Sequence, residues 1–158
     1  MARIAEGLAD ADIAYGDVDM VGDHTTKTVM RAWQAGTYRR GLFRTGWMPP
    51  HPTFYARRAV MDRVERFDTS YRIAADYDLM MRAMELTDFR VHYIPQVLVD
   101  FQLGGISSRD FRATVNSNLE SLRARRANLG TPPVDLALFL RPLRKLLEIK
   151  QLRGYYKG

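Results

Sequence analysis

The spacing of apolar residues along the chain predicts short strands that alternate with helices. The strongest helical signal runs over residues 76–86, where apolar side chains recur with a period near 3.6 residues. A long helix is also predicted over 111–129, because Gly130 follows it and suits a left-handed cap. Shorter helices are expected over 2–10, 58–64 and 134–153. Strands are expected where β-branched and aromatic residues lie between turn residues, over 12–16, 28–33, 53–56, 90–94 and 97–103.

Prolines and polar stretches set the predicted boundaries of these elements. Residues 48–52 read Met-Pro-Pro-His-Pro and cannot form regular helix or central strand, because three prolines lack amide donors. Pro95 is predicted to end one strand before the next begins, and the polar residues 17–27 are predicted to form turns. Alternating strands and helices predict an α/β fold, with one domain over 1–130 and a helical tail over 131–158.

Composition excludes several classes of protein. The 158 residues include no cysteine, so disulfide frameworks, thiolate zinc sites and cysteine nucleophiles are excluded. The first residues do not resemble a signal peptide, and no apolar run approaches the roughly 20 residues that span a bilayer. We therefore expect a cytoplasmic protein of ordinary globular composition.

The positive charge is concentrated at the end of the chain. The formal net charge is +6, and residues 141–158 hold six basic side chains against one glutamate. The rest of the chain is close to neutral, which argues against a nucleic-acid partner. Residues 134–158 mix these basic side chains with Leu, Phe and Ile, and this composition is typical of a helix attracted to an anionic membrane surface. A helix packed on the domain with a solvated basic face is the alternative.

The predicted helix over 76–86 carries the most informative acidic residue. At about 100° per residue, Asp78, Arg82 and Glu85 share one narrow polar arc, whereas Asp76 falls within the apolar arc. A carboxylate there is costly unless something uses it, although the first turn of a helix favours an anion. Asp76 is therefore a candidate general base, with helix capping as the alternative. Asp78 is predicted to pair with Arg82 at i,i+4, which is a structural role.

Five short motifs occur in a characteristic order over residues 1–108. They are Tyr15-Gly16-Asp17, His51-Pro52-Thr53-Phe54, Ala75-Asp76, Tyr93-Ile94-Pro95 and Gly104-Gly105-Ile106-Ser107. As an ordered set they resemble the second half of family two glycosyltransferases, in particular bacterial members that build surface polysaccharides and glycolipids. The resemblance implies a partial GT-A-like mixed sheet flanked by helices. It also implies that Asp76 deprotonates an acceptor hydroxyl during inverting transfer from a nucleotide-sugar. Many members have Glu-Asp at this motif, whereas this chain has Ala75 before Asp76.

The same resemblance implies parts that this sequence does not contain. Members of the family begin with a βαβ nucleotide-binding half that ends in an Asp-x-Asp metal motif. Only 16 residues precede Asp17-Val18-Asp19, too few for a βαβ unit, so these residues are interpreted as a strand end. No metal ligand is assigned in this chain, and a complete enzyme is expected to use Mg²⁺ or Mn²⁺ held mostly elsewhere. The chain alone is expected to be an inactive fragment.

Four further residues are candidates for substrate binding, each with a structural alternative. His51 would contact the acceptor or a phosphate, or else hydrogen-bond a nearby carbonyl. Trp47 would stack on a sugar, or else anchor its loop. Arg72 would meet a diphosphate, or else lie in solvent, and Asp17 ends the first motif strand. The expected partners are a nucleotide-sugar and a glycan or lipid-linked acceptor. A non-catalytic module that docks on a membrane or a partner enzyme is the alternative function.

Overall fold

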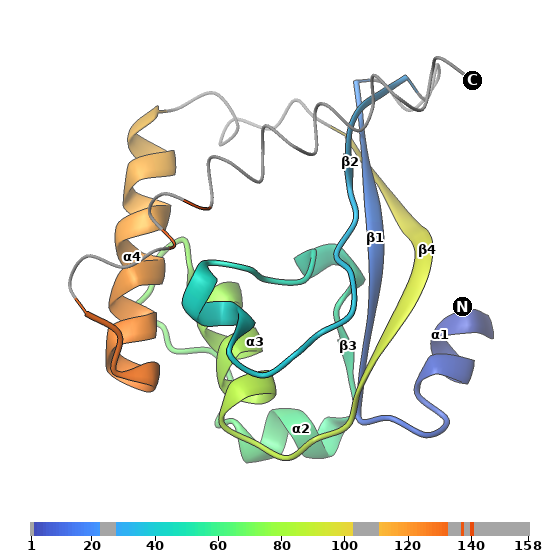
Figure 1. The fold of residues 1–158 in the computed structure, drawn as a ribbon, viewed down its shortest axis with the longest axis horizontal. Helices are drawn as coiled ribbons and strands as arrows, with labels where there is room; N and C mark the ends of the chain where they lie inside the picture. Colours follow the sequence, from blue (N-terminus) through green and yellow to red (C-terminus); the bar gives the residue numbers. More distant parts are fainter. Residues whose placement is uncertain (1, 23–27, 103–110, 133–136, 138–139, 141–158) are drawn as a thin grey trace.

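A mixed sheet centred on one strand organises the chain, and it confirms the predicted α/β class (Figure 1). The structure is a computed structural model that describes residues 2–22, 28–102, 111–132, 137 and 140. The strands are β1 (Ile13–Val21), β2 (Val29–Trp33), β3 (Tyr55–Ala56) and β4 (Val91–Gln102). The helices are α1 (Ala2–Gly7), α2 (Arg58–Arg63), α3 (Ala75–Glu85) and α4 (Phe111–Leu129), with 3₁₀ helices η1 (Leu42–Thr45) and η2 (His51–Thr53).

The central strand β1 pairs with every other strand of the sheet. It is antiparallel to β3 at Ile13 and Ala14 and antiparallel to β2 over 18–21, whereas β4 runs parallel to it along its length. In Figure 1, α2, α3 and α4 lie on one side of the sheet and α1 lies on the other. Helix α4 packs on the outer side of α3, so α3 is enclosed between the sheet and α4.

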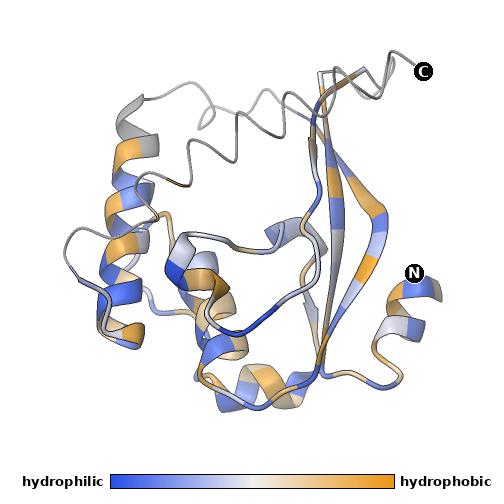
Figure 2. Ribbon diagram, viewed as in Figure 1, coloured by the Kyte–Doolittle hydropathy of each residue, from blue (hydrophilic) through white to orange (hydrophobic). Residues whose placement is uncertain are grey.

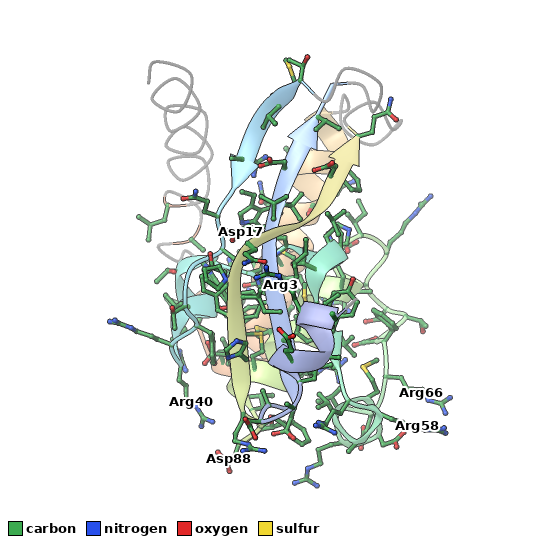
Figure 3. The ribbon with its side chains drawn as sticks, turned by 90° about the vertical axis from the view of Figure 1, so that its right-hand side faces the viewer. Arg3, Asp17, Arg40, Arg58, Arg66 and Asp88 are labelled. Atoms are coloured by element: carbon green, nitrogen blue, oxygen red, sulfur yellow. The ribbon has the colours of Figure 1, made fainter. Side chains whose placement is uncertain are left out.

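The prediction that Pro95 separates two strands is wrong, because β4 continues through it. Ile94 is paired with Gly16 and Val97 with the next residue of β1, so Pro95 and Gln96 form a bulge. A bulge tolerates proline because its amide is not needed for the ladder. Figure 3 shows β4 passing in front of β1 as it crosses from one paired stretch to the next.

This crossing explains why β1 has a glycine at its centre. A Cβ atom on Gly16 would lie 2.6 Å from the Leu98 side chain and 2.9 Å from the Gln96 carbonyl oxygen. Such distances are shorter than real carbon contacts, so any larger residue would push β4 away from β1. Gly16 is therefore required by the close approach of two backbones.

The prediction of turns after residue 16 is also wrong, because β1 extends to Val21. Asp17, the polar residue that suggested a turn, is only 7% exposed, and both of its carboxylate oxygens accept hydrogen bonds. The Tyr93 hydroxyl donates to its two oxygens at 2.8 and 3.0 Å, and the Ala35 amide donates to one of them at 2.9 Å. A buried carboxylate with these donors can continue a strand.

The proline-rich segment leads into a strand shorter than predicted. Residues 51–53 form η2, so only Tyr55 and Ala56 belong to β3. The buried Thr53 hydroxyl lies 2.8 Å from the carbonyl oxygens of Gly16 and Pro50 and accepts from the Gly16 amide at 3.3 Å. The Thr53 side chain therefore pairs with the backbone amide and carbonyl of Gly16, as the backbone of a neighbouring strand would.

Helix α3 is buried on nearly every side, including its polar arc. Hydrophobic residues on it join the core together with Ile13, Tyr15 and Phe43. Asp78 is 1% exposed and Glu85 is 8% exposed, and they accept hydrogen bonds from Asn128 and Gly41, which lie on other segments. The polar arc thus faces protein groups, which is why α3 lacks a solvated face.

Helix α4 has the predicted bounds, and Gly130 has the left-handed φ of 62° expected of its cap. Hydrophobic and hydrophilic residues alternate along α4, as in an amphipathic helix (Figure 2). None of the helices within the described ranges is long and apolar enough to cross a bilayer. The predicted helix over 134–153 and the tail domain 131–158 lie almost entirely outside the described residues.

Candidate functional site

One pocket brings together two of the residues that the sequence singled out. It has a volume of about 280 Å³ and lies between η2, β3, α2 and the start of α3. We call it the Asp76 pocket, and its lining residues are His51, Phe54, Ala56, Met61, Phe67, Asp76, Leu79 and Met80. Within the part of the chain that the structure describes, Asp76 and His51 are the ionisable side chains that line it.

Asp76 lies in the first turn of α3, and its carboxylate has two different environments. One oxygen, Oδ1, accepts the Tyr77 amide at 2.7 Å, which fixes the side chain against the helix start. The other, Oδ2, lies 3.7 Å from His51 Nδ1. The side chain is 38% exposed and lines the pocket, so the carboxylate is open both to the pocket and to solvent. This arrangement leaves one carboxylate oxygen available for an incoming proton.

The second polar residue, His51, begins η2 between two prolines. Its ring packs edge-on against Phe101 of β4, with centroids 6.3 Å apart, and its side chain is 52% exposed. The proline rings restrict the backbone on either side of it. Among the described contacts of the ring, the one to a carboxylate is with Asp76, whose Oδ2 lies 3.7 Å from Nδ1.

The start of α3 is capped by a residue that the sequence did not indicate. The N-cap position is Ala74, and its side chain makes no cap hydrogen bond. Instead Glu120 of α4 accepts the amides of Ile73 and Ala74 at 2.8 and 2.9 Å. Desolvation opposes it, yet these amides and that of Arg72 hold the pKa of Glu120 below its ordinary value. Ala74, rather than Asp76, occupies the N-cap position, although Asp76 accepts one free amide of the first turn, that of Tyr77.

The ring of Trp47 is placed as a loop anchor. It is 8% exposed, and its indole nitrogen donates to the Ala35 carbonyl at 2.9 Å. Its ring packs against Tyr15, Tyr38 and Phe43 at centroid distances of 5.9, 5.7 and 5.4 Å. A sugar would need an exposed ring face, so this geometry favours the anchoring alternative.

Asp17 and Arg72 lie outside the Asp76 pocket. Asp17 is buried in the sheet, as Figure 3 shows, with both oxygens engaged by Tyr93 and Ala35. Burial and its bond to Asp17 raise the pKa of Tyr93 to about 12, so this phenol stays a donor. Arg72 has an exposed side chain just before α3 and does not line the pocket.

A second hollow, of about 320 Å³, is lined by more charged residues, and the Arg82 and Asp78 side chains among them are bonded to other groups of the protein. It is lined by residues that include Glu65, Arg66, Asp78 and Arg82. The Arg82 guanidinium donates to Asp78 and to the carbonyls of Val64 and Arg66. In the turn that carries these carbonyls, Glu65 and Arg66 both have positive φ. These bonds hold a strained turn, so the hollow has a structural explanation.

Asp17 and Asp19 both lie on β1. Within the described ranges, no group of three or more His, Asp or Glu side chains is placed to hold a metal ion. Asp19 lies directly opposite Asp100 in the β1–β4 register. Burial raises the pKa of the Asp19 carboxyl, and the charges of Asp100 and Asp17 raise it further.

We expect Asp19→Asn to stabilise the protein at pH 7. The folded state raises the pKa of Asp19 above its ordinary 3.8, so ionisation of this carboxyl destabilises the folded state progressively as the pH rises above 3.8, and fully once the pH exceeds the raised value. Removing a like charge directly across a strand pair should add about 0.2–1 kcal/mol to the free energy of unfolding. The gain should shrink as the pH falls through the raised pKa.

Urea unfolding at pH 7 and pH 5 measures this gain, with the exposed Asp10→Asn as the matched control. A variant less stable than the parent at pH 7 would mean that the Asp19 carboxylate has a favourable partner instead.

No protein-family model matches this sequence, and neither a curated protein nor a solved structure matches it.

Proposed function

We propose that the Asp76 pocket is the acceptor side of an inverting glycosyltransferase, with Asp76 as the general base. Two independent observations support this proposal. One is the ordered set of motifs that resembles family two glycosyltransferases. The other is the position of Asp76, at the exposed edge of a pocket that holds one other ionisable side chain.

The position of Asp76 carries the argument. A general base must lie within about 3 Å of the hydroxyl proton that it removes, so it needs an oxygen that is open to substrate. Oδ1 is occupied by the Tyr77 amide, and this bond orients Oδ2 toward the pocket and His51. An acceptor that enters the pocket would bring its hydroxyl to Oδ2.

The proposed reaction is a single displacement. The acceptor oxygen attacks the anomeric carbon of the nucleotide-sugar while its proton passes to Oδ2 of Asp76. The new carbon–oxygen bond forms on the face opposite the departing nucleoside diphosphate, which leaves with the bonding electron pair. The configuration at the anomeric carbon is therefore inverted.

The donor side is not part of this site. The described residues form no cluster that fits a divalent metal. The proposal therefore leaves the donor diphosphate, and the Mg²⁺ or Mn²⁺ expected with it, to other parts of the protein.

The proposed setting is the synthesis of a surface polysaccharide or glycolipid at the cytoplasmic side of a membrane. This setting rests on the resemblance and on the basic composition of residues 134–158. Of that segment the structure describes only residues 137 and 140.

The stereochemistry of the product tests the proposed function. The natural protein that carries this sequence is incubated with nucleotide-sugars, Mn²⁺ and hydroxyl acceptors. Proton NMR then records the anomeric coupling of the first product formed. We expect a β-linked product from an α-linked donor, together with one nucleoside diphosphate per transfer. Retention of configuration would contradict the assignment of Asp76 as a base in a single displacement.

A further inference from the structure

The Asp76 pocket is polar at one edge and apolar everywhere else. Beyond His51 and Asp76, its lining consists of Phe54, Ala56, Met61, Phe67, Leu79 and Met80. A sugar ring enclosed in the pocket would need several hydrogen-bonding groups, because each hydroxyl that leaves water without a partner costs free energy. Among the described lining side chains, Asp76 and His51 can recognise a hydroxyl, and the group that meets the other six must be largely apolar.

The size of the pocket limits what it can enclose. Its volume of about 280 Å³ lies below the roughly 300–1,000 Å³ that holds a whole drug-sized ligand. The pocket therefore takes one part of an acceptor and leaves the rest outside. Phe67 is 54% exposed at its border, where it can cover an apolar group as that group enters.

We infer that the acceptor is an amphiphilic alcohol, whose apolar group fills the pocket while a neighbouring hydroxyl meets Asp76 Oδ2. This inference rests on the proposed function, and it selects a lipid-linked or alkyl-bearing acceptor over a free glycan. The apolar group supplies affinity by leaving water, at about a fourfold change in the dissociation constant per buried methylene. The single carboxylate at the edge supplies orientation.

Binding of two glucosides to the full chain tests this inference without requiring transfer. Octyl β-glucoside, kept below its micelle-forming concentration, is compared with methyl β-glucoside by NMR of the methionine methyl groups. We expect octyl glucoside to shift the signals of Met61 and Met80 saturably and to bind at least about tenfold more tightly. The signal of Met30, on β2, should stay in place.

A matched pair of variants distinguishes the pocket from general hydrophobic adsorption. Phe67 and Met30 are exposed to nearly the same extent, 54% and 55%, so replacing either with serine should preserve the fold. Phe67→Ser should weaken octyl glucoside binding about fivefold or more, while Met30→Ser should leave it unchanged. Equal losses in both variants would overturn the inference.

The remaining outcomes separate the inference from the proposed function. If both glucosides bind alike while the natural protein still performs inverting transfer, the apolar acceptor is wrong and the function stands. If octyl glucoside binds as expected but transfer is unaffected by Asp76→Asn, the pocket binds amphiphiles and their assignment as acceptors is overturned.

Discussion

Replacing Glu85 with alanine should lower the free energy of unfolding by about 2–5 kcal/mol. The Glu85 carboxylate is 8% exposed and accepts the Gly41 amide at 2.8 and 2.9 Å and the Phe43 amide at 3.2 Å. Alanine would leave both amides without their carboxylate acceptor in a largely dry place, and each unsatisfied group costs about 1–3 kcal/mol. A domain of this size is stable by only about 5–15 kcal/mol, so the loss is a large fraction.

A graded series checks the role of Glu85. Glu85→Gln keeps one carbonyl oxygen as an acceptor and should fall between the parent and Glu85→Ala. Glu6→Ala, on the exposed face of α1, should change stability by less than about 0.5 kcal/mol. Urea unfolding gives the midpoints, which should shift at constant slope. If Glu85→Ala behaves like Glu6→Ala, the carboxylate does not hold η1 in place.

The sequence predicted most elements because their signals are local. Helices α3 and α4 have strong periodicity or a clear cap, and both occur within one residue of the predicted bounds. Strand β2 was likewise found from the alternation over 28–33. The α/β class follows from these local patterns alone.

The errors arose where the structural role of a residue depends on a contact with a residue far away in the sequence. Asp17 was interpreted as a strand end, and only Tyr93, far along the chain, makes it a buried strand residue. Pro95 was interpreted as a stop, but the crossing of β4 over Gly16 makes it part of a bulge. Neither partner can be identified from the neighbouring sequence.

The candidate site shows the same limit. Asp76 and His51 were selected from sequence, and the fold brings them to one pocket. Trp47 was interpreted either as a sugar platform or as a loop anchor, and its burial among aromatic rings fits the anchor. Glu120 was missed because it caps α3 from another helix, and such a contact leaves no signal beside the helix that it caps.

The last prediction is that Asp76→Asn lowers the turnover of the natural protein by about 10²–10⁴-fold, the usual contribution of a general base. Asparagine keeps the shape of the side chain, and its oxygen can still accept the Tyr77 amide. The side chain is 38% exposed, so the free energy of unfolding should change by less than about 0.5 kcal/mol. The loss should therefore appear in kcat, with a smaller effect on KM.

Asp78→Asn is the matched control, because it lies two residues away on the same helix and makes the same chemical change. Asp78 is paired with Arg82 at 2.7 Å and accepts from Asn128 at 3.0 Å, in a buried position. Neutralising it should cost stability, since Arg82 loses the charge of its partner. Turnover per folded molecule should stay close to that of the parent.

His51→Gln distinguishes the two ionisable residues of the pocket. His51 Nδ1 lies 3.7 Å from Asp76 Oδ2, beyond direct hydrogen-bond distance, so the histidine lies beside the carboxylate without bonding to it. If Asp76 is the base, the histidine variant should lose less turnover than Asp76→Asn. If His51→Gln instead abolishes transfer while Asp76→Asn retains most of it, the base is the histidine and the carboxylate only positions it.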